Sequence, residues 1–276
     1  MELIEQVSNF LNRPMPLWEN GLTSLLVLDK SQQLNLIKAD YNIENCVLRQ
    51  VKTKALIFDI AGTEIKIEAP TDTLNNFYDS HGLEPLSELL IHKLGVDTKI
   101  SDTLNMLALI PAISDFLKNI VKTIQVIRPE NEETDISYSH PEIPFSIFVS
   151  VCEASSLRST LRVAESILHE AMHLKLTLVE NILPLIQPFS GNVFFSPWRD
   201  EKRPARGVLH GLFVFRAILD YFTTIIDRPE VKPERPYIES RIAQIKTDLS
   251  QLKDFASCID LTKDGAILTK NLLPSS

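Results

Sequence analysis

The stretch from Ser156 to Ile182 constrains the fold of this 276-residue chain most strongly, because its pattern predicts one long helix. Two histidines in it, His169 and His173, stand four residues apart. On a helix they project from one face, with about 5–6 Å between their Cβ atoms, which lets two imidazoles share a metal ion. Glu170 points about 100° away around the helix. Together these residues form the His-Glu-x-x-His pattern of metal-dependent hydrolases.

The distribution of histidines favours a site over two unrelated histidines on a helix. Three of the six histidines of the chain fall within the 42 residues from His169 to His210, and the others are scattered. A catalytic metal with open coordination positions needs at least one further protein ligand beyond such a pair. A third ligand is therefore expected downstream of the helix.

His210 is the strongest candidate for that third ligand. It follows a proline-rich loop and stands near the start of a second predicted helix, although a histidine packed in an apolar core would show the same pattern. The three-histidine pattern of zinc proteases fails, because Leu176 and Val179 occupy the offsets where glycine and histidine are needed. Glu180 comes only two turns after the pair, which is too far along the same helix, and Glu201 remains a loop candidate.

Composition limits the classes of partner and the location. Hydrophobic residues make up 44% and charged residues 23%, as in ordinary globular proteins, while 8 glycines and 7% aromatics favour a helix-rich fold. A net charge of -8 disfavours nucleic acid and anionic membranes as partners. Cys46, Cys152 and Cys258 lack metal-site spacing, and no apolar run is long enough to span a membrane. We expect a cytoplasmic protein and make no prediction of its oligomeric state.

The order of the patterns predicts an α+β protein that is mainly α-helical. Residues 56–67 alternate about Ala61-Gly62-Thr63, which indicates a small β-hairpin in the N-terminal half. A helix is predicted over 101–126, with a break or new start at Pro111. The polar, acidic stretch 128–141 indicates a linker.

The second half of the chain begins with a predicted strand at 145–151, just before the long helix. An irregular loop is predicted over 184–207 and an apolar helix over 208–226. We expect an N-terminal, mainly helical region over 1–135 and a metal-binding catalytic region over 136–276.

The loop before His210 adds a second informative feature. Arg199 and Arg203 flank a turn there, and the planar fork of an arginine can grip a carboxylate at two points. The alternative is a solvated charge cluster with Asp200 and Glu201. Lys175 and Arg206 are also candidates to contact an acidic substrate, but we expect both to be exposed surface charges.

Three blocks of sequence, taken in order and spacing, resemble the HExxH-type peptide β-hydroxylase family, over roughly Ile143 to Tyr221. The blocks are His169-Glu170-Ala171-Met172-His173-Leu174-Lys175-Leu176, then Pro197-Trp198-Arg199-Asp200 with Arg203-Pro204, then Gly207-Val208-Leu209-His210-Gly211 with Phe213 and Phe215. That family is associated with iron, with 2-oxoglutarate, and with the modification of ribosomally made peptides. The N-terminal half carries no resemblance.

The resemblance implies a set of roles. His169, His173 and His210 become ligands of Fe(II), and Arg199 and Arg203 become candidates to hold the carboxylate of 2-oxoglutarate. Three histidines depart from the usual arrangement of two histidines and one carboxylate, so Glu165 and Asp200 are alternatives to His210.

The implied function is hydroxylation of a side-chain β-carbon of a precursor peptide, with Glu170 orienting a ligand or a water. In the alternative, a zinc metallopeptidase, Glu170 would be the catalytic residue that activates the zinc-bound water. A second alternative is a non-enzymatic interaction protein in which the histidines are structural.

Overall fold

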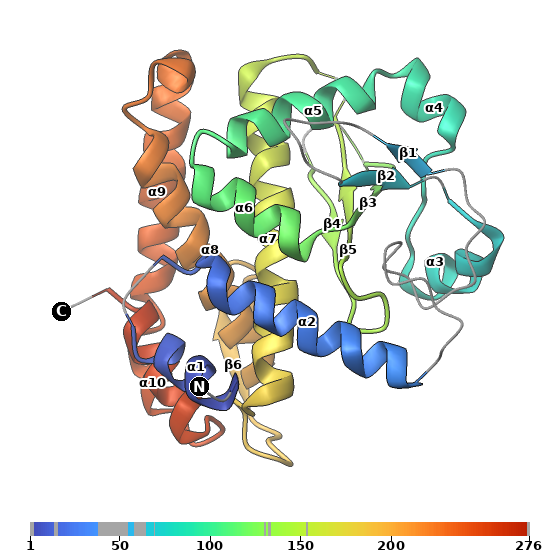
Figure 1. Cartoon of the computed structure of the whole chain (residues 1–276). Coiled ribbons are helices and arrows are strands. Elements are labelled where there is room, and N and C mark those ends of the chain that lie inside the picture. Colours follow the sequence, from blue (N-terminus) through green and yellow to red (C-terminus); the bar gives the residue numbers. More distant parts are fainter. Residues whose placement is uncertain are drawn as a thin grey trace. The chain divides into compact units, whose positions relative to one another are not determined.

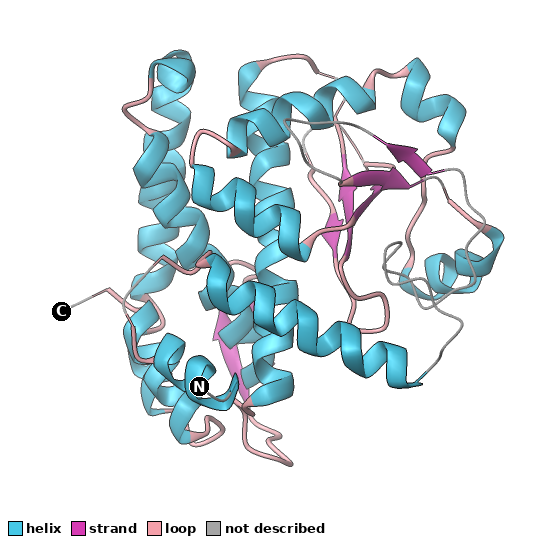
Figure 2. Cartoon of the chain, in the orientation of Figure 1, coloured by secondary structure: helices cyan, strands magenta, loops and turns pink. Residues whose placement is uncertain are grey.

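The computed structural model describes residues 3–13, 16–37, 55–57, 65–68, 70–129, 131, 134–152 and 154–274. Over these residues the protein is mainly helical with a small sheet, which confirms the α+β class (Figures 1 and 2). The chain divides into two compact units. The terminal unit comprises Met1–Leu26 and Lys175–Ser276, and the middle unit comprises Val27–Leu174. The terminal unit is thus made of two separate stretches of the chain, on either side of the middle unit. The regions 1–135 and 136–276 expected from the sequence were defined differently, by the role expected of each region.

The middle unit is built on a sheet with the strand order β1-β2-β3-β5-β4. Its strands are β1 (Ala55–Ile57), β2 (Lys66–Glu68), β3 (Thr123–Ile127), β4 (Ser137–Tyr138) and β5 (Ser146–Ser150). The neighbours β2, β3 and β5 run parallel, while β1 and β4 pair antiparallel at the two edges. Every residue of β3 and β5 is buried, as expected of parallel strands covered on both faces.

Two predictions about this sheet are confirmed, and one is wrong only in its last residues. The antiparallel pairing of β1 with β2 confirms the arms of the predicted hairpin, whose turn at Ala61-Gly62-Thr63 lies outside the described residues. β5 confirms the strand predicted before the long helix. The helix predicted over 101–126 forms as α5 (Val96–Leu107) and as α6 (Pro111–Ile120), which confirms the new start at Pro111, but its last residues belong to β3 instead. The β-branched residues of β3 gain more by pairing between β2 and β5 than by continuing a helix.

Three short helices follow β2 in the chain. They are η2 (Asp72–Leu74), α3 (Asn75–His81) and α4 (Glu88–Lys93). Tyr78 of α3 packs in one cluster with Ile127 of β3 and Phe148 of β5, so α3 lies against these strands. Tyr138 of β4 packs against the same cluster.

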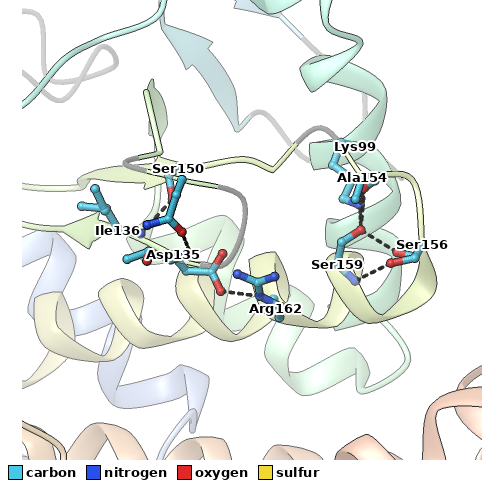
Figure 3. A network of polar contacts seen from close by, with 10 residues as sticks. Lys99, Asp135, Ile136, Ser150, Ala154, Ser156, Ser159 and Arg162 are labelled. Carbon is cyan, nitrogen blue, oxygen red and sulfur yellow. Dashed lines mark hydrogen bonds and ion pairs between the residues drawn. The ribbon is translucent and has the colours of Figure 1, made fainter.

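The long helix is α7 (Leu157–Ile182), which confirms the helix predicted from Ser156. It contains no glycine or proline, so nothing interrupts its backbone hydrogen bonds. The Ser156 hydroxyl accepts a hydrogen bond from the Ser159 backbone N–H at 3.2 Å, as a cap does at a helix start. Lys99 of α5 donates to the Ala154 carbonyl at 2.7 Å and also contacts the Ser159 hydroxyl (Figure 3). The boundary between the units falls inside α7, between Leu174 and Lys175.

The segment that leads into β4 is tied to α7 and to β5. The Arg162 guanidinium of α7 donates to Asp135 at 2.7 Å. The Ile136 backbone N–H donates to the Ser150 hydroxyl of β5 at 2.8 Å (Figure 3). The residues just before β4 are therefore bound both to α7 and to β5.

The terminal unit is organised around α8 (Ala205–Ile225). Its other elements are α1 (Leu3–Leu11), the start of α2 (Asn20–Ile37), the end of α7, β6 (Val193–Ser196), β7 (Glu201–Pro204), η3 (Pro229–Glu234), α9 (Arg235–Ser250), η4 (Lys253–Ser257) and α10 (Lys263–Leu272). By length and composition α8 could cross a membrane, but 72% of its apolar window is buried inside the protein. This is the pattern of a core helix.

The predicted irregular loop before α8 contains an antiparallel hairpin, β6–β7. Asp200 adopts a positive φ of 51° at its turn, and this lets the chain reverse within a few residues. α8 begins at Ala205, so His210 lies in its second turn, somewhat further into the helix than the sequence predicted.

The expectation that Lys175 is an exposed charge is wrong. Its side chain is fully buried, and its ammonium donates to the carbonyls of Leu17 at 2.7 Å and Glu19 at 2.9 Å. The ammonium also lies 4.6 Å from the centre of the Phe10 ring. Lys175 lies on the buried side of α7, where the link between α1 and α2 supplies the acceptors that compensate for lost water.

Candidate functional site

The two histidines of α7 face each other at their ring tips. The Nε2 atoms of His169 and His173 lie 3.0 Å apart, and the ring centres lie 4.7 Å apart. Two nitrogens bound to one ion at about 2.1 Å and at right angles are separated by about 3 Å, so the pair fits two adjacent ligands. A hydrogen bond between two neutral imidazoles has the same separation. The four-residue spacing on a helix is sufficient to create this pair.

Glu170 lies beside the pair, but its carboxylate is held by other residues. The Ser137 hydroxyl donates to Oε1 at 2.6 Å, and the Ser139 hydroxyl donates to Oε2 at 2.7 Å. The side chain is almost completely buried, and Oε1 is 3.9 Å from the Nε2 atom of His169. Glu170 is thus placed next to the imidazoles in one defined orientation. Sequence reasoning missed both serines, since Ser137 comes from β4 and Ser139 from the residues that follow it, far from Glu170 in the chain.

His210 lies in the terminal unit, in a buried polar cluster with Glu180 and Arg206. Its Nε2 atom is 3.0 Å from Oε2 of Glu180, and the Arg206 guanidinium contacts the same oxygen at 2.7 Å. Burial lowers the pKa of His210, and Glu180 offsets this only in part, while Arg206 and Arg203 lower it further. Burial acts to raise the pKa of Glu180, but His210 and Arg206 outweigh it and lower that pKa. We therefore assign a neutral imidazole whose Nε2–H donates to an ionised carboxylate.

This pairing has a chemical consequence for His210. A metal-binding histidine usually donates its other ring N–H to a carboxylate, which fixes the ring and its tautomer. Glu180 supplies such a carboxylate, which leaves Nδ1 as the nitrogen with a lone pair to offer. Arg206 and His210 are four residues apart on α8, and this spacing indicated in the sequence that they share one face of the helix. Glu180 comes from α7 and carried no such signal.

Of the two arginines predicted to hold a carboxylate, Arg203 is the one near His210. It belongs to β7, its charge acts on the pKa of His210, and its guanidinium packs near Gly207 at the start of α8. It forms an ion pair with Glu201, with 3.8 Å between the arginine Nε and a carboxylate oxygen. Arg199 is exposed at the turn of the β6–β7 hairpin. Arg206, which is half-exposed as expected, adds a second basic residue to this cluster.

The predicted site residues thus fall into two groups. His169, His173 and Glu170 come together in the middle unit, while His210, Arg203, Arg206 and Glu180 come together in the terminal unit. Within the parts of the chain that the structure describes, no group of three or more His, Cys, Asp or Glu side chains is arranged to hold a metal ion. Coordination of one ion by all three histidines is therefore a proposal.

Trp198 fixes the β6–β7 hairpin against α8. Its ring lies 4.9 Å from that of Phe215, and a Cβ atom on Gly211 would lie only 2.2 Å from its Nε1 atom. Gly211 therefore has to be glycine for Trp198 to pack here, directly beside His210.

Gly211→Ala is expected to destabilise the protein by about 1–3 kcal/mol, because the indole must move and take the hairpin with it. Urea unfolding measures this effect. Gly191→Ala is the matched control, since a Cβ there meets nothing within 4 Å, and we expect it to change stability by less than about 0.5 kcal/mol. Equal stability of the two variants would contradict the packing described.

Comparison with models of known protein families finds no match to this chain, and comparison with curated protein sequences finds none either.

Proposed function

We propose that this protein is an Fe(II)- and 2-oxoglutarate-dependent oxygenase that hydroxylates a side-chain β-carbon of a precursor peptide in the cytoplasm. The observation that carries the proposal is the 3.0 Å separation of the His169 and His173 Nε2 atoms, which suits two adjacent ligands of one ion. We propose His210 as the third ligand. Arg203, together with Arg199, is proposed to hold the carboxylate of 2-oxoglutarate that lies away from the metal.

The roles follow from the chemistry of each side chain. Fe(II) with 2-oxoglutarate and oxygen supplies the oxidising power that turns a carbon–hydrogen bond into a carbon–hydroxyl bond, while 2-oxoglutarate becomes succinate and carbon dioxide. An imidazole must be neutral to bind a metal, and burial favours the neutral form of His210 by lowering its pKa. The guanidinium of Arg203 offers two parallel N–H donors to a carboxylate. Glu170 orients a neighbouring ligand or water.

One observation favours the alternative of a zinc metallopeptidase. Glu170 Oε1 lies 3.9 Å from the Nε2 atom of His169, close enough to activate a water on an ion held by that nitrogen. However, each oxygen of Glu170 already accepts a hydrogen bond from a serine hydroxyl. This arrangement suits a carboxylate of fixed orientation better than a general base that exchanges protons with water.

Metal analysis of anaerobically purified protein, followed by an assay of succinate formation with peptides, tests the proposal. Bound iron together with 2-oxoglutarate-dependent succinate supports it. Zinc with peptide cleavage that is independent of 2-oxoglutarate would overturn it in favour of the peptidase. Protein that binds neither metal would overturn it in favour of a non-enzymatic interaction protein with structural histidines.

Glu170→Gln separates the two enzymes. We expect the oxygenase to keep measurable turnover, with a loss of about 10–100-fold, because Glu170 acts there only on orientation. A peptidase would lose its general base, which alone contributes about 10²–10⁴-fold. The rates of succinate formation and of peptide cleavage are the measurements, and complete loss of succinate formation would contradict an orienting role.

A further inference from the structure

The serines on either side of Tyr138 converge on one carboxylate. Ser137 and Tyr138 form β4, and Ser139 follows directly after the strand. Alternate side chains of an extended chain point to opposite sides, so Ser137 and Ser139 share a side and Tyr138 points away from it. Their hydroxyls donate to the two different oxygens of Glu170, at 2.6 Å and 2.7 Å. On the other side, the Tyr138 ring lies 6.2 Å from that of Phe148 and anchors the strand in the core.

Two short hydrogen bonds to different oxygens leave the Glu170 carboxylate little freedom to rotate. The side chain is only 3% exposed, so water cannot readily replace either hydroxyl. The direction of this carboxylate relative to the His169 imidazole, 3.9 Å away, is therefore set by Ser137 of β4 and by Ser139 just after it.

We propose that Ser137 and Ser139 are positioning residues that act through Glu170 on the metal held by His169 and His173. This inference rests on the proposed metal site. Groups that orient the surroundings of a metal ligand typically change metal affinity about 10–100-fold when they are removed. Loss of both hydroxyls removes one donor from each oxygen of a buried carboxylate, so that it turns and the environment of the ion changes.

The attachment of β4 does not depend on these serines. Asp135 is bound by Arg162 of α7, and the Ile136 N–H is bound by the Ser150 hydroxyl (Figure 3). Removing the two hydroxyls should therefore leave the strand in place. Asp135→Asn provides the matched control, because it weakens the tie between this segment and α7 without touching Glu170.

Titration of the full chain with Co(II), followed by the visible spectrum of the bound ion, tests the inference. We expect the double variant S137A/S139A to bind Co(II) about 10-fold or more weakly and to show shifted absorption bands. The variant S137T/S139T keeps both hydroxyls and should restore the affinity and spectrum of the original protein. Asp135→Asn should bind as the original protein does.

Each other outcome overturns a definite statement. Unchanged Co(II) affinity and spectrum in S137A/S139A would overturn the positioning role and leave the metal site standing. Equal losses in Asp135→Asn and S137A/S139A would also overturn it, because attachment of the strand would then be the cause. An original protein that binds no Co(II) would overturn the proposed function, and this inference with it.

Discussion

Replacing His173 with alanine is expected to lower the affinity for Fe(II) or Co(II) by more than about 100-fold, beyond the range seen for groups that only support a ligand. The reason is geometric. The variant removes one of the two Nε2 atoms that lie 3.0 Å apart, so the ion loses one of its two proposed ligands on α7. Titration with Co(II), and succinate formation with 2-oxoglutarate, measure the two consequences.

His92→Ala is the matched control for this variant. His92 also lies on a helix of the middle unit, is about half-exposed, and is 3.4 Å from Asp97. We expect it to bind metal and to turn over as the original protein does. Unchanged affinity in His173→Ala would contradict the metal site. Full activity in His210→Ala would contradict only the assignment of the third ligand.

Lys175→Ala is expected to reduce the free energy of unfolding by about 3 kcal/mol or more. The variant removes a fully buried side chain from contact with Phe10 and deprives the carbonyls of Leu17 and Glu19 of their donor. A loss of this size is a large fraction of the stability of a typical protein. Urea unfolding provides the measurement. Lys175→Met keeps most of the volume and should cost less, and equal losses in both variants would contradict the contribution of packing.

The same residue predicts a pH dependence. Burial lowers the pKa of Lys175 to about 7, partly offset by the charge of Glu19, whereas the unfolded chain keeps a value near 10.4. Between these values the unfolded chain binds more protons, so the contribution of Lys175 to stability rises as the pH increases from about 7 to about 10. The free energy of unfolding of the original protein, relative to that of Lys175→Met, should therefore rise over this pH range. A constant difference would contradict the lowered pKa.

Part of the site could be predicted because it is local. The pair His169 and His173 depends only on helical periodicity, and α7 forms with nearly the bounds expected. Glu170 was found for the same reason. What holds Glu170 could not be found, because Ser137 and Ser139 lie 33 and 31 residues away along the chain, in and just after β4. Nothing in the spacing of serines predicts which carboxylate they will meet.

Burial was the other quantity that local patterns did not reveal. A lysine after His173 looks like a surface charge, yet Lys175 is buried because the segment at Leu17 and Glu19 supplies its acceptors. Likewise, residues 123–127 continue an apolar helical pattern, but as β3 they pair with β2 and β5.

The amino-acid sequence alone was enough for the helical class, the long helix and its two facing imidazoles, since each depends on residues within a few turns of one another. Packing of distant segments decided the strand at 123–127, the burial of Lys175, the Glu180 partner of His210 and the hydroxyls that orient Glu170. These depend on which donors and acceptors meet when water is excluded, and that is set by the assembled fold.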